Sequence, residues 1–186
     1  MNDKTPYGGC LLLAEPFMLD PNFKRTVIIL VQHNEEDGSL GFVLTRPAPM
    51  MLEDVIDGFE GFVAPLFVGG PVQMDTLHYL HSLGEKLPGS VEVSPGLFWG
   101  GDFEVLKELV QAGEVQPEQF KFFLGYSGWS PDQLVEEMKE DSWITQPAKS
   151  KYIFRTEAEN LWKKVLQDKG GDYVMMVNFP ENPILN

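Results

Sequence analysis

The sequence is short of basic residues, of histidine and above all of cysteine. Its 186 residues include a single cysteine, Cys10, which excludes an intramolecular disulfide and a zinc site built from several cysteines. Acidic residues outnumber basic ones by 28 to 14, and the net charge of -14 repels the phosphates of nucleic acids and anionic lipids. The composition therefore argues against direct nucleic-acid binding and fits a reducing compartment.

Long hydrophobic runs are also missing. The longest apolar run near the beginning of the chain, CLLLA at residues 10–14, is too short for the hydrophobic core of an export signal or for a membrane span. We therefore expect a cytoplasmic protein that does not associate with membranes. Hydrophobic residues nevertheless make up 43% of the chain, which is enough to bury the core of one domain.

Strand-like and helix-like segments alternate along the chain without a repeat or a linker, which indicates a single α+β domain over residues 1–186. Strands are expected at 10–15, 26–32, 40–45, 64–71, 77–83 and 120–126. Helices are expected within 51–59, between Asp102 and Gly113, from Ser130 onward, and from Thr156 to Gly170. The apolar, proline-containing tail at 171–186 is expected to pack as an irregular arm.

The segment GYSGW places Ser127 between an expected strand and an expected helix, where a hydrolase would hold its nucleophile. That turn needs a glycine two residues after the serine, and Trp129 stands there instead. Ser130, Pro131 and Gln133 are typical of a helix N-terminus. We therefore predict no catalytic serine at this turn. A hydrolase or transferase that uses His33 or His81 as its base, together with Ser127, is the alternative.

Patterns for metals and cofactors are incomplete. On a strand, the spacing of His78 and His81 points their rings to opposite faces, so the two cannot share a metal ion. The acidic loop at 34–38 lacks the carboxylate that a calcium loop needs at its last position. The glycine pairs at 69–70 and 100–101 belong to no nucleotide-binding motif. We predict no metal and no cofactor.

Polar residues bracket the apolar segment at 26–32. Asp20 and Arg25 precede it, and His33 and Asn34 follow it. Such residues either converge on one ligand or satisfy the backbone of turns. The candidate ligand-binding surface combines these four residues with the turn of Gly69, Gly70 and Pro71 and with His81.

Four segments carry a family resemblance: LDPNFKRTVIILVQHNEEDGSLGFVLTRP, VGGPVQMDTLHYLH, LGYSGW and DSWI. Together they resemble the AlgH family, also called YqgE-type proteins, a group of bacterial proteins without an established biochemical activity. The resemblance covers residues 9 to about 165. It implies a compact α+β domain with a mixed, partly barrel-like sheet flanked by helices. The chain departs from the commoner pattern at Asp102 and Phe103, where a serine-arginine pair often stands.

The AlgH family often carries the label of transcriptional regulator. This chain has no helix-turn-helix with a basic recognition helix and no cluster of Lys and Arg for phosphate contacts. These residues argue against direct DNA binding, so a regulatory effect is expected to be indirect. We predict a non-catalytic binding or regulatory module that acts through a protein partner or a small ligand. The oligomeric state is left open.

Overall fold

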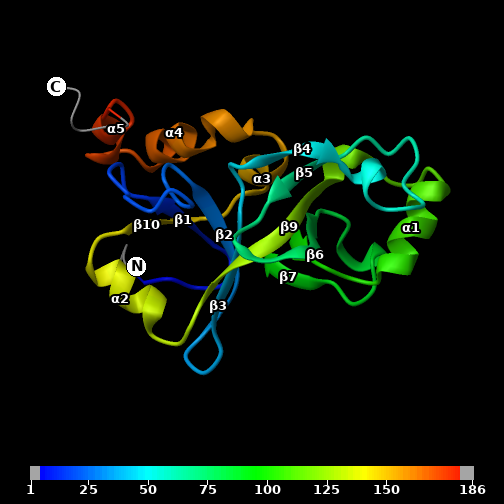
Figure 1. Cartoon of the computed structure of the whole chain (residues 1–186), viewed down its shortest axis with the longest axis horizontal. Helices are drawn as coiled ribbons and strands as arrows, with labels where there is room; N and C mark the ends of the chain where they lie inside the picture. The colour runs from blue at the N-terminus through cyan, green and yellow to red at the C-terminus, as the bar shows by residue number, and fades with distance from the viewer. Residues whose placement is uncertain (1–4, 181–186) are drawn as a thin grey trace.

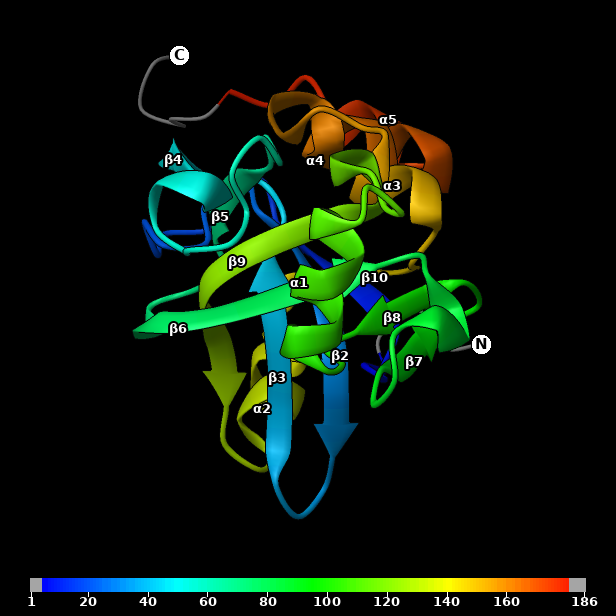
Figure 2. The ribbon, with the colours of Figure 1, turned by 90° about the vertical axis from the view of Figure 1, so that its right-hand side faces the viewer.

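The computed structural model describes residues 5–180, and within them ten strands form one curved sheet (Figures 1 and 2). The strands are β1 Cys10–Ala14, β2 Val27–Asn34, β3 Gly38–Val43, β4 Pro47–Met51, β5 Pro65–Val68, β6 Val72–His81, β7 Val91–Ser94, β8 Leu97–Trp99, β9 Phe120–Trp129 and β10 Trp143–Pro147. The helices are α1 Phe103–Gln111, α2 Gln133–Lys139, α3 Ser150–Phe154, α4 Ala158–Lys169 and α5 Tyr173–Met176. Short 3-10 turns lie at Leu52–Asp54, Gly84–Lys86 and Pro117–Gln119.

Strand β9 joins the two halves of the sheet. Along one edge it pairs antiparallel with β6. Along the other edge it pairs in parallel with β5 at Phe122–Leu124 and then antiparallel with β3 at Ser127–Trp129. Between these two partners stands Gly125, whose φ of 65° suits glycine best. The result is a single α+β domain whose mixed, mostly antiparallel sheet curls into half a barrel, as the resemblance implied.

The turn of Gly69, Gly70 and Pro71 is packed onto β9. A Cβ atom on Gly69 would lie 2.4 Å from the carbonyl oxygen of Gly125, and one on Gly70 would lie 2.2 Å from the carbonyl of Tyr126. The Gly69 N–H donates to the Leu124 carbonyl at 2.8 Å, and its carbonyl accepts from the Val43 N–H at 2.8 Å. The two glycines therefore allow the chain to cross β9 in direct backbone contact.

In the first half of the sheet, β1 and β2 are buried on both faces. Alternate residues such as Leu11 and Ile29 pack in the cluster that includes α3 and α4. Their neighbours, such as Leu12 and Ile28, pack in the cluster that includes α2. Burial on both faces makes β2 a central strand of the sheet. Each of these fully buried side chains contributes roughly 1.5–3 kcal/mol to folding.

The second half of the sheet carries α1, and this helix has the predicted ends. The Asp102 carboxylate accepts from the N–H groups of Glu104 and Val105 at 3.0 and 3.2 Å, which caps the first turn. Gly113, with a φ of 70°, follows the last turn. Leu106 is buried in an aromatic cluster beneath the helix.

Two expected helices differ from the structure. The helix within 51–59 was wrong: only the 3-10 turn Leu52–Asp54 forms, because the Leu52 N–H bonds to the Ala64 carbonyl and Gly58 turns the chain with a φ of 91°. Helix α2 begins at Gln133 and not at Ser130, because Asp132 has a φ of 66°.

Three further expectations need correction. The turn expected around Ser127 is absent because β9 continues to Trp129. Thr156 does not cap α4, since its hydroxyl donates to the Lys151 carbonyl at 2.9 Å. The tail contains a short helix, α5, and its residues 181–186 lie outside the described part of the chain. Strands β4 and β10 and helix α3 were not foreseen from the sequence.

The crossing at β9 predicts a severe effect of one added methyl group. We expect Gly70→Ala to lower the free energy of unfolding by about 3 kcal/mol or more, because the methyl would overlap the Tyr126 carbonyl. The matched control is Gly8→Ala, where the nearest atom to an added Cβ is 3.7 Å away and the change should stay within about 0.5 kcal/mol. Denaturant unfolding of both variants measures the difference. Equal losses in the two variants would contradict the crossing.

Candidate functional site

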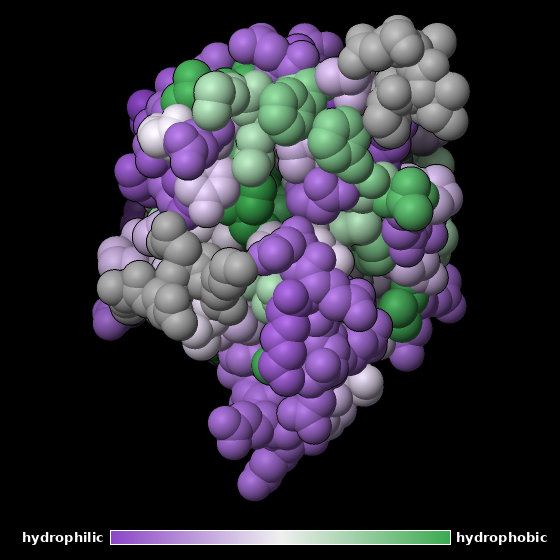
Figure 3. Space-filling view, turned by 90° about the vertical axis from the view of Figure 1, so that its left-hand side faces the viewer, coloured by the Kyte–Doolittle hydropathy of each residue, from purple (hydrophilic) through white to green (hydrophobic). Residues whose placement is uncertain are grey.

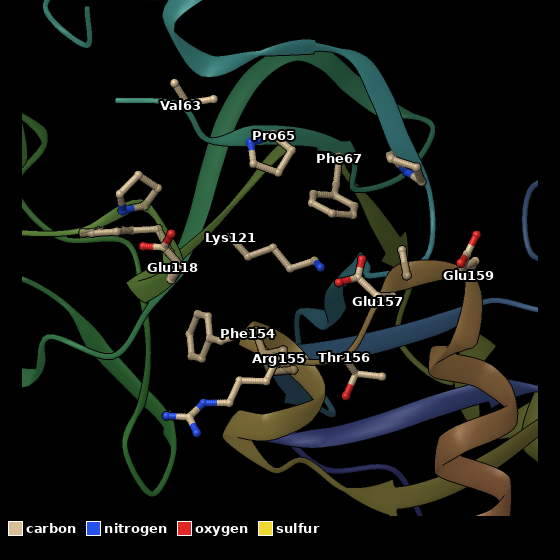
Figure 4. Close-up of a pocket in the computed structure, with 15 residues that line it drawn as sticks. Val63, Pro65, Phe67, Glu118, Lys121, Phe154, Arg155, Thr156, Glu157 and Glu159 are labelled. Atoms are coloured by element: carbon tan, nitrogen blue, oxygen red, sulfur yellow. The ribbon is translucent and has the colours of Figure 1, made fainter. Parts of the chain in front are cut away.

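A pocket of about 470 Å³ lies where β4, β5 and β9 face the connection between α3 and α4 (Figure 4). One wall is formed by Pro47, Val63, Pro65 and Phe67. A second wall is formed by Pro117, Glu118, Phe120 and Lys121, and the third by residues 153–159. The pocket therefore draws on three stretches of chain that are distant in sequence.

Lys121 reaches into this pocket from β9. Strand alternation places it on the same face as Phe123 and opposite Phe120 and Phe122. Its residue is only 7% exposed, and its Nζ lies 3.7 Å from the centroid of the Phe67 ring. Within the described part of the chain its ammonium makes no hydrogen bond and no ion pair. The three N–H donors of the ammonium thus face the pocket, and the contact with the Phe67 ring is the main interaction that stabilises the charge.

Charged groups surround the Lys121 amine at a distance. Figure 4 shows its side chain extending across the pocket toward Glu157, with Phe67 on one side and Phe154 on the other. Burial lowers the pKa of Lys121 to about 8, and the negative charge of Glu157 opposes this shift. Glu118, Glu159 and Arg155 also line the pocket, and the guanidinium of Arg155 points away from the amine.

The four polar residues around β2 do not converge. Asp20 and Arg25 lie before this eight-residue strand and His33 and Asn34 lie at its end, so roughly 25 Å separates the pairs. The Asp20 carboxylate accepts from the Asn22 N–H at 2.8 Å. The Asn34 amide oxygen accepts from the N–H groups of the next loop at 3.0 and 2.6 Å. Both side chains thus satisfy the backbone of turns.

Arg25 holds the end of the chain against the sheet. Its guanidinium lies 4.5 Å from the Trp162 ring and donates to the Phe179 carbonyl, while its Nε is buried without a partner. Its backbone has a φ of 52°.

On the face of the molecule that Figure 3 presents, apolar side chains gather in the upper part, and the lower part is hydrophilic. Phe17 and Phe179 stack on one another with centroids 5.6 Å apart.

His33 lies in a second pocket, of about 570 Å³, which is also lined by Asn34, Ser130 and Asp132. Its Nδ1 is 2.7 Å from the hydroxyl of Ser39, the residue directly opposite on β3. In the described part of the chain, none of the three histidines is hydrogen-bonded to a carboxylate. The histidine therefore has a hydroxyl partner but no orienting acid.

His81 is fully buried, and both of its ring nitrogens are engaged. Nδ1 accepts from the Leu83 N–H at 3.2 Å, so Nε2 carries the proton and donates to the Gly100 carbonyl at 2.9 Å. Burial lowers the pKa of this imidazole, which keeps it neutral. His78 faces the other way and packs on Phe42, which confirms that the two rings lie on opposite faces. The one basic lone pair of His81, on Nδ1, accepts from the Leu83 N–H and is therefore not free to act as a base.

The turn of Gly69, Gly70 and Pro71 lines neither of these two pockets. Ser127 is buried, and its hydroxyl donates a hydrogen bond to the Gly69 carbonyl at 3.1 Å. Among residues 5–180, no group of three His, Cys, Asp or Glu side chains is arranged to hold a metal ion. The helices of the same range are all too short or too polar to cross a membrane.

Comparison with known proteins places the chain. The family model described as AlgH-like matches residues 11–174. The chain belongs to the AlgH-like family. Relatives include the UPF0301 protein of Chlorobaculum tepidum, which is 48% identical over 96% of this chain and 95% of that protein. A UPF0301 protein of Bacteroides fragilis is 40% identical over 100% of this chain and 94% of that protein.

Two solved structures share this fold, and one of them supports the family membership. The solution structure of the AlgH protein from Pseudomonas aeruginosa matches with a TM-score of 0.72 and 30% identity over 97% of this chain and 98% of that chain. A crystal structure of a Corynebacterium diphtheriae protein matches with a TM-score of 0.78 at 20% identity, over 96% and 95%, which shows the fold alone. The family match includes every residue that lines the Lys121 pocket.

In this AlgH-like chain, sequence reasoning missed Lys121 as a site residue. The available signal was its place inside FKFFLGY, where apolar residues occupy both faces of the strand. A strand that is covered on both sides has no solvent face, so a lysine within it must be buried. The partners Phe67 and Glu157 are distant in sequence and gave no signal.

Burial of the Lys121 amine predicts a pH-dependent stability. Since its pKa is about 8 in the folded protein and 10.5 ordinarily, the unfolded chain binds more protons between these values, and the free energy of unfolding rises with pH across this window. We expect Lys121→Met to be about 1–3 kcal/mol more stable than the wild type at neutral pH. The difference should shrink as the pH rises from 8 to 10.5.

Urea unfolding at several pH values measures this difference. Lys163→Met, which removes an exposed lysine on α4, is the matched control and should follow the wild type. A gap between Lys121→Met and the wild type that does not change above pH 8 would rule out a buried amine with a lowered pKa.

Proposed function

We propose that this AlgH-like protein is a non-catalytic binding module whose pocket at Lys121 takes a small amphipathic carboxylic acid. The observation that carries the proposal is Lys121, a residue only 7% exposed whose ammonium faces the pocket and meets no hydrogen-bond acceptor among residues 5–180. A buried ammonium with unsatisfied donors is costly. A carboxylate from a ligand would supply the missing acceptors and the opposite charge.

The pocket walls favour an acid with an apolar part. Phe67, Pro65 and Phe154 give the amine an apolar surround against which a short aliphatic or aromatic stem can pack. A volume of about 470 Å³ suits a small molecule. The carboxylates of Glu118, Glu157 and Glu159 disfavour ligands with several negative charges. A monocarboxylate fits this balance better than a nucleotide does.

A regulatory role would then follow from occupancy of the pocket. The α3–α4 connection forms one wall, and β5 and β9 form the others, so a ligand would touch both the helical layer and the sheet. Ligand binding to the folded state stabilises it by an amount that grows with the logarithm of ligand concentration above the dissociation constant. Such a module acts on a protein partner, because the net charge of -14 disfavours direct contact with DNA.

Binding of short monocarboxylates is the direct test. We expect hexanoate and octanoate to raise the melting temperature, and 1-hexanol at the same concentration to raise it less, since it lacks the charge. Lys121→Met should weaken hexanoate binding at least about tenfold, or about 1.4 kcal/mol. Lys163→Met is the control and should bind as the wild type does. Equal binding by Lys121→Met and the wild type would remove the proposal.

A second function, serine hydrolysis, rests on the 2.7 Å contact between His33 and Ser39. Labelling with a fluorophosphonate probe, followed by peptide mapping, separates it from the first. We expect no label at Ser39, because no carboxylate orients His33 in the described part of the chain, and none at the buried Ser127. A label at Ser39 that disappears in Ser39→Ala would instead support a hydrolase with His33 as base.

A further inference from the structure

We propose that Lys121 forms a reversible imine with a 2-oxo acid, so that the pocket captures a carbonyl compound covalently. The proposal rests on the proposed function, because the carboxylate of the 2-oxo acid is the group that the pocket is inferred to receive. It goes beyond that function by assigning a nucleophile and a bond. The chemical class is an aliphatic 2-oxo monocarboxylate, in which the carbonyl carbon is adjacent to the carboxylate.

The geometry of the amine supports a nucleophilic role. Lys121 lies on β9 opposite Leu80 of β6. The next residue, Phe122, lies opposite Leu66 of β5 on the other edge. Pairing on both edges holds the backbone rigidly. Its Nζ projects into the pocket above the Phe67 ring at 3.7 Å. No acceptor in the described part of the chain engages the amine. By contrast, Lys151 and Lys164 are both held in ion pairs with Asp168.

The protonation state of the amine is compatible with attack. Burial lowers the pKa of Lys121 to about 8, so roughly one tenth of the amine is neutral at neutral pH. An exposed lysine with an ordinary pKa is neutral to roughly one part in several thousand under the same conditions. The buried amine is therefore the more nucleophilic one by a large factor.

The bond changes balance without an oxidant or a reductant. The nitrogen lone pair attacks the ligand's carbonyl carbon, and the carbonyl π electrons move to the oxygen, which takes a proton as the nitrogen releases one. The resulting carbinolamine expels its hydroxyl group, with a second proton, as water while the nitrogen lone pair forms the C=N bond. One amine, one carbonyl and one proton give one protonated imine and one water.

Glu157 is the group placed to move these protons. The Lys121 side chain extends toward its carboxylate across the pocket, from β9 to the residue just before α4 (Figure 4). A carboxylate at this position can accept the proton released by nitrogen and return it to the departing hydroxyl. The protonated imine keeps the positive charge of the lysine, so Phe67 and the ligand's own carboxylate stabilise it as they do the ammonium.

Reductive trapping tests the proposal. The full chain is incubated with 2-oxohexanoate and sodium cyanoborohydride, and the adducts are mapped by peptide mass spectrometry. We expect one adduct per chain at Lys121, at least about tenfold faster than at any exposed lysine. The trapping rate should rise with pH up to about 8, because burial lowers the pKa of Lys121 to about 8 against the opposing charge of Glu157, while Glu118, Glu159 and Arg155 line the pocket without pointing at the amine.

Three variants sharpen the test. Lys121→Arg keeps a cation in the pocket but has no nucleophilic amine, so it should bind hexanoate better than Lys121→Met does and give no adduct at this position. Glu157→Gln should lower the rate of trapping at Lys121 severalfold, and this factor should exceed the factor by which it raises the dissociation constant for hexanoate. Lys163→Arg is the matched control and should leave the Lys121 adduct unchanged.

The outcomes separate this proposal from the one it rests on. Hexanoate binding that depends on Lys121, without a Lys121 adduct from 2-oxohexanoate, would overturn the imine and leave the binding module standing. Loss of both would overturn both. Adducts distributed over exposed lysines in proportion to their number would likewise overturn the imine, since they would show ordinary amine reactivity.

Discussion

The structure depends on the direct backbone contact between the Gly69-Gly70 turn and β9. This contact lets one strand serve two parts of the sheet, because the chain crosses β9 where its partner changes from β5 to β3. Without it β5 could not pair in parallel with β9 while β3 pairs antiparallel with the next residues of the same edge. The curl of the sheet, the central position of β9 and the shape of both halves follow from this crossing.

The position of Lys121 is a consequence of that arrangement. A strand shared by two halves of a sheet has neighbours on both edges and layers on both faces, so every side chain on it is at least partly enclosed. The lysine is therefore buried by the architecture, and among residues 5–180 its ammonium contacts the Phe67 ring and forms no ion pair with a carboxylate. The pocket exists because the α3–α4 connection closes over this strand without filling the space above the amine.

Local patterns predicted the elements whose causes are local. The strands β2 and β3 and the two ends of α1 at Asp102 and Gly113 depend on a few neighbouring residues, and the sequence pattern predicted each. The expected helix at 51–59 failed because a long-range bond from Leu52 to Ala64 overrides its apolar spacing. Whether the polar residues at the ends of β2 converge or satisfy turns depends on distance along the strand, and in the structure they do not converge, while Asp20 and Asn34 satisfy turns. The Lys121 pocket is formed by three segments that are distant in sequence, so no short sequence motif could predict it.

The position of β1 has a consequence for synthesis. β1 comes first in the chain, yet its outer neighbour is β10, and the Trp162 indole donates to the Ala14 carbonyl at 2.9 Å. On the ribosome, the apolar run at 10–14 therefore emerges long before the residues that cover it. Until about 160 residues have been made, the nascent chain must keep this segment from pairing with other edges. The first strand to appear is therefore among the last to be enclosed, so the order of synthesis runs opposite to the order in which this edge of the sheet is completed.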